Sequence, residues 1–472
     1  MAQHKVPGNV DAGLSGVSAK IVLAVACCAQ FMVVLDISVV NVALPSIRDA
    51  LGFDETSQQW VVNAYALTFA GFLLLGGRLA DWCGRRRIFL IGLALFAGAS
   101  LVGGLANSAT ALVAARAVQG LGAAVLAPAT LTILTTTFPE GRVRTRALAT
   151  WTAVGVAGGT AGNLAGGVLT EYLSWRSTLL INVPIGVVVA ILTVRHVVAD
   201  RTEAVGPRPD VAGAVLATAG LGGLAFGMAE AADAGWSSRS AVAGLVIGSV
   251  LLAVFVAIEA RWAASPLIPL RLFTIRSLSV GNVAMLLAGA CLNPMWFFLT
   301  LSMQNALAYS PVQTGLAFLP HTVVTVVVGA LATPWLMRHV DGRILIMVGA
   351  LLAALGFWWQ SQLTVQSSYL AGILGPAVVF SIGSGLLNTP LTTAVTSGVP
   401  TSDAGAASGL MNTTKQVGGA LGLAALVTVA TTDRTGPAAQ IDANSRAFSV
   451  IAVIMIAVAV VVLVLPAQRD RK

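Results

Sequence analysis

Charged residues are scarce in this chain of 472 residues, of which Asp, Glu, Lys and Arg make up only 10%. An average soluble protein carries about 25% charged residues. With 57% hydrophobic residues, the chain can supply about fourteen apolar stretches of about 20 residues, the length of a helix that crosses a bilayer. This composition excludes a soluble enzyme and a disordered chain, and it predicts an all-α polytopic membrane protein.

Cysteine is also scarce. The spacing of the four cysteines suits neither a disulfide framework nor a metal site, since they lie in or beside apolar runs at Cys27, Cys28, Cys83 and Cys291. The sequence offers no cluster of His, Cys and carboxylates for a metal or a nucleophile, so we expect no cofactor, no metal, no catalytic residue and no enzymatic activity. The net charge of +8 is scattered between apolar runs, which argues against binding to nucleic acid.

A hydropathy window of about 19 residues predicts fourteen membrane spans. They lie at 21–46, 60–80, 88–107, 110–133, 147–170, 177–194, 211–230, 240–258, 280–303, 312–336, 344–361, 369–394, 406–428 and 447–465. The longest connections separate six, two and six spans, which is typical of internally repeated transporters. The predicted units are a tail (1–20), an N-terminal six-helix bundle (21–195), two inserted helices (211–258), a C-terminal six-helix bundle (279–465) and a second tail (466–472).

The distribution of basic residues predicts the orientation. With both termini in the cytoplasm, 20 of the 27 Lys and Arg residues lie on the cytoplasmic side, five lie on the other side and two lie within spans. Cytoplasmic loops carry such an excess, so we expect both tails in the cytoplasm. Arginine outnumbers lysine 23 to 4, and Ala, Gly and Val dominate. That composition favours a bacterial source with a GC-rich genome, and hence the bacterial cytoplasmic membrane.

Three residues with formal charge lie well inside the spans: Asp36, Arg116 and Lys415. Such residues are usually paired and functional, because a charge in hydrocarbon costs at least about 2.5–3.5 kcal/mol. Asp36 lies about 15 residues into the first span, roughly 22 Å from its cytoplasmic end. A carboxylate there can take up a proton, and an approaching cation or Arg116 would expel it. We therefore predict that Asp36 and Arg116 couple protons to transport, with a purely structural ion pair as the alternative.

The fifth span contains glycines at helical spacing. Gly158, Gly162 and Gly166 form one row, and Gly155, Gly159, Asn163 and Gly167 form the next. Glycine at this density weakens a helix but allows close packing and sliding. We interpret both rows as a moving interface between the bundles, with simple close packing as the alternative.

Several further polar and aromatic residues are candidates for a substrate cavity. Gln119 shares a helix face with Arg116, and Lys415 either lines a cavity or extends towards the cytoplasm. His321 can bind substrate or satisfy a helix-to-helix hydrogen bond. The full candidate set is Asn41, Gln119, Trp296, Phe297, Phe298, His321 and Lys415. The three aromatic residues are explained equally well by packing.

These motifs together resemble those of the major facilitator superfamily, and within it the fourteen-span drug:proton antiporters. The segment Gly77-x-Leu79-Ala80-Asp81-x-x-Gly84-Arg85-Arg86 is similar to the signature of the loop between spans 2 and 3. The segment Arg116-x-x-Gln119-Gly120-x-Gly122 is similar to the span 4 signature, which the family ties to proton transfer. Leu35-Asp36 through Pro45, and Ser174-Trp175-Arg176 with Ile181-Asn182-Val183-Pro184-Ile185-Gly186, resemble the fourteen-span branch.

The resemblance implies proton-coupled efflux of a small lipophilic drug, antibiotic or secondary metabolite by alternating access, with a monomeric transport unit in the bilayer. It also implies that Asp81 and Arg85 hold the cytoplasmic side closed against the start of span 13. One position departs from the pattern, because Asn163 stands where the antiporter signature usually has proline. A facilitator or proton symporter for a small metabolite on the same fold is the alternative.

Overall fold

The computed structural model describes residues 16–54, 56–139, 141–198, 210–261, 266–400, 403–431 and 436–466. Within these residues the helices form fourteen rods of membrane-spanning length, one for each predicted span. The first seven are α1 (Gly16–Leu51), α2 (Trp60–Cys83), α3 (Arg85–Gly104), α4 (Ala109–Thr137), α5 (Arg142–Tyr172), α6 (Trp175–Leu180) with α7 (Asn182–His196), and α8 (Val211–Ala234). The tails predicted at 1–20 and 466–472 lie largely outside the described residues.

The second seven rods contain several interruptions that the hydropathy pattern does not predict. They are α9 (Arg239–Arg261), α10 (Arg276–Leu292) with α11 (Pro294–Leu301), α12 (Pro311–Val327) with α13 (Thr333–Leu336), α14 (Gly342–Gln360), α15 (Gly375–Thr396), α16 (Ala404–Ala430) and α17 (Pro437–Val462). Short π-helical turns extend or join them at Ser302–Ala306, Val328–Ala332 and Leu370–Leu374. Proline begins α11 because it lacks the N–H that a continuous helix would need there.

Length and composition alone identify twelve of the described helices as able to cross a membrane. The other two rods, α5 and α16, carry more glycine and polar residues, but with 31 and 27 residues both are long enough to span a bilayer. The fold class predicted from the sequence, an all-α membrane protein with fourteen helices, is confirmed.

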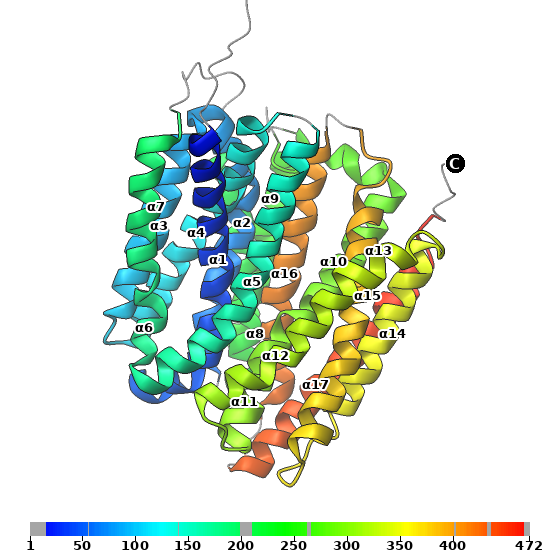
Figure 1. Cartoon of the computed structure of the whole chain (residues 1–472). Helices are drawn as coiled ribbons and strands as arrows, with labels where there is room; N and C mark the ends of the chain where they lie inside the picture. Colours follow the sequence, from blue (N-terminus) through cyan, green and yellow to red (C-terminus); the bar gives the residue numbers. More distant parts are fainter. Residues whose placement is uncertain are drawn as a thin grey trace, which may run out of the picture.

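The rods form two bundles with the inserted pair beside them (Figure 1). Helices α1–α4 and α7 share one apolar core. A larger core joins α10–α12 and α14–α17 and extends to parts of α1, α2, α4 and α6. In the inserted pair, α8 packs against both α2 and α16, whereas α9 packs chiefly against α8. Close backbone contact between Gly223 of α8 and Gly248 of α9 joins the pair.

Where the two bundles meet, α5 crosses α12 in the lower half of Figure 1, and α2 lies against α16. The α5–α12 contact involves the end of α5 that precedes a loop predicted to lie outside the cell. Gln304 Nε2 also donates a hydrogen bond to Val42 O (2.8 Å), and the Val312 N–H donates one to Glu171 Oε2 (2.9 Å). The bundles are therefore joined at their outer ends.

Candidate functional site

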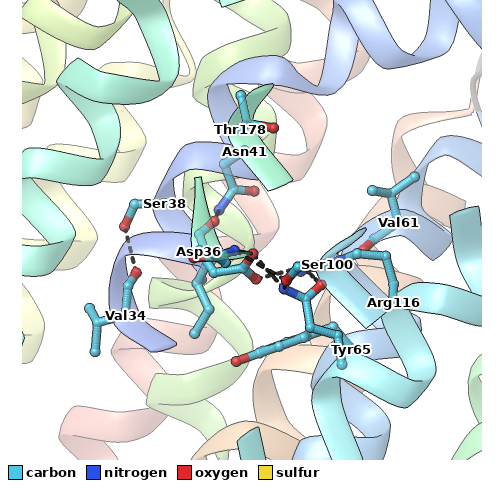
Figure 2. Close-up of polar contacts among 12 residues, drawn as sticks. Val34, Asp36, Ser38, Asn41, Val61, Tyr65, Ser100, Arg116 and Thr178 are labelled. Carbon is cyan, nitrogen blue, oxygen red and sulfur yellow. Dashed lines mark hydrogen bonds and ion pairs between the residues drawn. The ribbon is translucent and has the colours of Figure 1, made fainter. Parts of the chain in front are cut away.

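A buried ion pair joins α1 to α4 inside the N-terminal bundle. Arg116 Nη1 donates a hydrogen bond to Asp36 Oδ2 at 2.6 Å, and the two side chains are 2% and 0% exposed. Figure 2 shows the Asp36 side chain pointing towards Ser100 and Arg116, whereas Ser38 points to the other side of the helix. Neither charge can reach water, and a buried charge without a partner is strongly destabilised. The two charges therefore compensate each other.

Two further side chains donate to Asp36, and both also form hydrogen bonds with Ser100. Gln119 Nε2 donates to Asp36 Oδ1 (2.7 Å) and to Ser100 Oγ (2.6 Å). Asn182 Nδ2 donates to the same Asp36 oxygen at 2.9 Å and approaches Ser100 Oγ at 3.3 Å. The Asp36 carboxylate therefore accepts hydrogen bonds from α4 and α7, and two of its donors, Gln119 and Asn182, also form hydrogen bonds with Ser100 of α3. We call Asp36, Ser100, Arg116, Gln119 and Asn182 the Asp36 network.

The Arg116 guanidinium is also held by α2. Its Nε donates to Val61 O at 3.0 Å, and its Cζ lies 4.4 Å from the centroid of the Tyr65 ring. A second bond from Nη1 goes to Gln119 Oε1 at 2.7 Å. A cation over an aromatic face is stabilised by the ring quadrupole. Arg116 is thus fixed against four groups, of which only the carboxylate carries charge.

Two polar atoms beside this network form no hydrogen bond within the part of the chain that the structure describes. They are the Tyr65 hydroxyl and Asn182 Oδ1. Sequence reasoning missed Ser100, Asn182 and Tyr65 as members of the site. The available signals were a single serine in an apolar span and the asparagine of the Ile181–Gly186 motif, which interrupts the sixth rod between α6 and α7.

The first glycine row packs inside the N-terminal bundle, whereas we expected both rows to lie between the bundles. A Cβ at Gly162 would lie 2.7 Å from Leu35 O, and one at Gly166 would lie 2.8 Å from Val39 O. A Cβ at Gly158 would lie 2.9 Å from Phe31 O. These glycines allow α5 to contact the segment of α1 that carries Asp36.

In the second row, Gly155 and Gly159 also lie against α1, whereas Asn163 and Gly167, nearer the outer end of α5, meet the C-terminal bundle. A Cβ at Gly167 would lie 2.5 Å from Pro311 O of α12, and one at Gly315 would lie 2.5 Å from Asn163 O. The Asn163 side chain is buried at this contact. Asn163 and Gly167 therefore lie between the bundles, and the contact is made by backbone against backbone.

The loop between α2 and α3 is a tight turn at Gly84, whose φ of 91° favours glycine. Gly77 has open packing, because a Cβ there would meet only Pro128 Cβ at 3.7 Å. Arg86 Nη2 donates to Val194 O (2.8 Å), and Arg85 is half-buried. The side chain of Asp81 lies outside what the structure describes.

The start of α16, the predicted partner of this loop, carries an ion pair of its own. Arg271 donates to both carboxylate oxygens of Asp403, at 2.6 and 2.7 Å. This bidentate bond raises the pKa of Arg271. Asp403 is thus held by the segment that precedes α10.

The aromatic candidates separate into two places. Trp296 packs edge-on against His321 and Phe318, each at 4.8 Å between centroids, and His321 forms a hydrogen bond with Ser381. Phe297 and Phe298 instead line a cavity of about 260 Å³. The other lining residues are Arg48, Thr56, Gln58, Ala232, Asp233, Leu301, Val427, Ala430, Thr431, Gln440 and Asn444. The cavity lies at the outer end, between the bundles and α8.

The remaining candidates are Asn41 and Lys415. Asn41 is buried and donates from Nδ2 to Ile37 O (2.9 Å) of its own helix. Lys415 is half-buried in the middle of α16, and within the described residues it forms no hydrogen bond or ion pair.

Comparisons with known proteins agree with this architecture. The family model described as Major Facilitator Superfamily matches residues 26–423. The chain is 58% identical to the cephamycin export protein CmcT of Amycolatopsis lactamdurans, over 94% of this chain and 92% of that protein. It is 40% identical to the puromycin resistance protein pur8 of Streptomyces alboniger, over 94% and 89%. Among solved structures, the POT family transporter PepTSo has a TM-score of 0.71 at 15% identity, and the match covers 95% of this chain and 97% of that one. This likeness is one of fold.

Proposed function

Since this chain belongs to the major facilitator superfamily, we propose that it exports lipophilic antibiotics or related secondary metabolites from a bacterial cell in exchange for protons. Relatives at 58% and 40% identity are named for cephamycin export and puromycin resistance. Because the alignments with both relatives cover nearly the whole chain, they support the same kind of activity for this protein. All fourteen helices come from one chain, so we propose that the monomer is the transport unit and that its activity is transport rather than catalysis.

The observation that carries the proton-coupling part is the Asp36 network. Asp36 is the one carboxylate in the middle of a described span that is paired with a buried cation. Protonation would remove its charge and leave Arg116 with only neutral acceptors, Val61 O and Gln119 Oε1. A buried arginine without its counter-ion is strongly destabilised. The helices would therefore rearrange when Asp36 binds or releases a proton.

The glycine contacts provide a route from Asp36 to the boundary between the bundles. Leu35, next to Asp36, lies against Gly162 of α5, and one turn further along α5 Gly167 lies against Pro311 of α12. A shift of α1 at Asp36 would thus move the helix that joins the outer ends of the bundles. Separation of α5 from α12 would open the outer side, as alternating access requires.

We propose two further elements of this cycle. The cavity lined by Phe297 and Phe298 would form the outer part of the substrate route, since it combines aromatic walls with polar groups such as Gln440 and Asn444. The loop at Gly84, through Asp81 and Arg85, would hold the cytoplasmic side closed against the start of α16 in the outward-facing state. Release of the Arg271–Asp403 pair would free Asp403 for that contact.

Inside-out membrane vesicles test the proposed function. A pH gradient that makes the lumen acidic is imposed on vesicles that contain the protein. A panel of antibiotics that includes a cephamycin and puromycin is then added outside. We expect accumulation that collapses when a protonophore removes the gradient. Accumulation that only equilibrates, and that ignores the protonophore, would show a facilitator instead. Vesicles without the protein serve as the control.

A further inference from the structure

Lys415 is a cation in the interior of the protein whose charge nothing described in the structure balances. The other two charged residues singled out inside the spans, Asp36 and Arg116, neutralise each other at 2.6 Å. Lys415 forms no ion pair or hydrogen bond with any described residue. Among these three residues, one positive charge is therefore left without a counter-ion.

The position of Lys415 along α16 rules out an escape of the ammonium group to either membrane surface. Lys415 lies about 17 Å from the helix start at Ala404 and about 22 Å from its end at Ala430, at 1.5 Å per residue. A lysine side chain extends about 6 Å, so it remains within the membrane region. A charged group at that depth is costly unless it has water or a counter-ion.

The polarity of α16 shows which way Lys415 faces. Ser408, Asn412 and Lys415 follow one another at helical spacing, and each is partly or fully accessible. The opposite side of the helix carries Val417 and Leu421, which pack with Leu67 of α2 and Leu221 of α8. An accessible row of serine, asparagine and lysine is incompatible with hydrocarbon. This row therefore faces the interior between the bundles.

Two amide side chains beside Lys415 are already engaged in hydrogen bonds with other groups. Asn412 Nδ2 donates to Ser408 O (3.0 Å), and Gln416 Oε1 accepts from Asn293 Nδ2 (3.3 Å). Neither supplies a negative charge, whereas an ammonium group has three donors to satisfy. A counter-ion for Lys415 must therefore come from outside the described residues.

We infer that Lys415 binds the anionic group of the exported compound, so that the preferred substrates are lipophilic molecules that carry a carboxylate. This inference rests on the proposed export function and adds the charge of its substrate. A lipophilic cation would be repelled by Lys415, and the Asp36 carboxylate would not be free to bind it, because Arg116, Gln119 and Asn182 already donate to it. An anionic lipid headgroup offers the same chemistry as a substrate carboxylate, and the experiment separates the two.

Three fluorescent probes with one apolar body test the inference. They are pyrenebutyrate, its uncharged amide, and the corresponding pyrenebutyl trimethylammonium cation. Binding to the purified full-length chain in detergent is followed by energy transfer from tryptophan to pyrene. The variants are Lys415→Gln and Lys415→Arg, with Lys20→Gln, at the exposed start of α1, as the matched control.

The wild type and Lys20→Gln should bind the carboxylate about tenfold or more tightly than the amide, and the cation least tightly. Lys415→Gln should lose this preference while binding the amide as the wild type does, which shows that it is folded. Lys415→Arg should keep the preference, since it keeps the charge. Equal binding of carboxylate and amide by the wild type, or an unchanged preference in Lys415→Gln, would overturn the inference.

Two further arms complete the test. Added phosphatidylglycerol should leave the affinity for pyrenebutyrate unchanged, and competition would assign the site to a lipid headgroup and overturn the inference. In proteoliposomes with a pH gradient, the wild type should export pyrenebutyrate. A wild type that exports no member of the antibiotic panel, yet keeps its preference in binding, would overturn the proposed function alone.

Discussion

Arg116 Nη1 lies 2.6 Å from Asp36 Oδ2, and both side chains are enclosed within the N-terminal bundle. The pair belongs to two helices that are far apart in the sequence, and Gln119 and Asn182 bind the same carboxylate. The pair lies next to the α1–α5 contact, and in the cycle we propose this position links the charge state of one carboxylate to the packing of the helix that meets the other bundle.

We predict that the effects of Arg116→Met and Asp36→Asn on stability are not additive. Removing one partner of a buried ion pair costs about 3–5 kcal/mol, whereas replacing both is often nearly neutral. The apparent Tm of the purified protein should therefore fall more in Arg116→Met than in the double variant. A double variant whose loss equals the sum of the single losses would show that the residues do not interact.

We predict that the ring of Tyr65, and not its hydroxyl, supports Arg116. The ring lies 4.4 Å below the guanidinium, while the hydroxyl has no hydrogen-bond partner among the described residues. Tyr65→Phe should keep the Tm of the wild type. Tyr65→Leu should lower it, because a cation–π contact contributes about 0.5–2 kcal/mol. A larger loss in Tyr65→Phe than in Tyr65→Leu would contradict this assignment.

We predict opposite outcomes for two glycines of the same motif. Gly84 has a φ of 91°, which strains any residue with a Cβ, by about 1–3 kcal/mol. Gly84→Ala should lower both the Tm and the transport rate. Gly77→Ala is the matched control, because its new Cβ would meet only Pro128, at 3.7 Å. Equal effects of the two substitutions would show that the turn does not depend on glycine.

We predict that a side chain at Gly315 separates the outer ends of the bundles. A Cβ there would lie 2.5 Å from Asn163 O, so Gly315→Val cannot keep the α5–α12 contact. Spin labels at Tyr172 and Val365, both exposed on the outer side, should move apart relative to the wild type. Gly98→Val is the control, since nothing lies within 4 Å of a Cβ at Gly98. An unchanged distance in Gly315→Val would contradict the role of this contact.

The membrane spans could be predicted because their signal is local. Runs of apolar residues bounded by arginine, glycine and proline define all fourteen rods, including α5, in which the glycine rows lower the apolar content. The interruption at Asn293–Pro294 and the π-helical turn at Ser302–Ala306 could not be predicted. They depend on packing between helices and leave little trace in hydropathy.

The site was predicted only in part. A sequence shows which residues carry charge, but it does not show the direction in which each side chain points in the fold. Asp36 and Arg116 stand out as charges in apolar spans, and the span 4 motif adds Gln119. Ser100 and Asn182 are neutral, and their role follows from the way α3 and α7 meet α1. Likewise, the spacing of the span 5 glycines shows two rows, but only the fold shows that the glycines of the first row face α1 and that Asn163 and Gly167 of the second meet α12.

The central claim, that Asp36 couples protons to export, is tested most directly in proteoliposomes that contain a pH-sensitive dye. Addition of an exported antibiotic should move protons across the membrane in the wild type. In Asp36→Asn, which keeps the side chain's shape and removes the titratable group, the proton movement should be absent. Substrate-driven proton movement of equal size in both proteins would contradict the account.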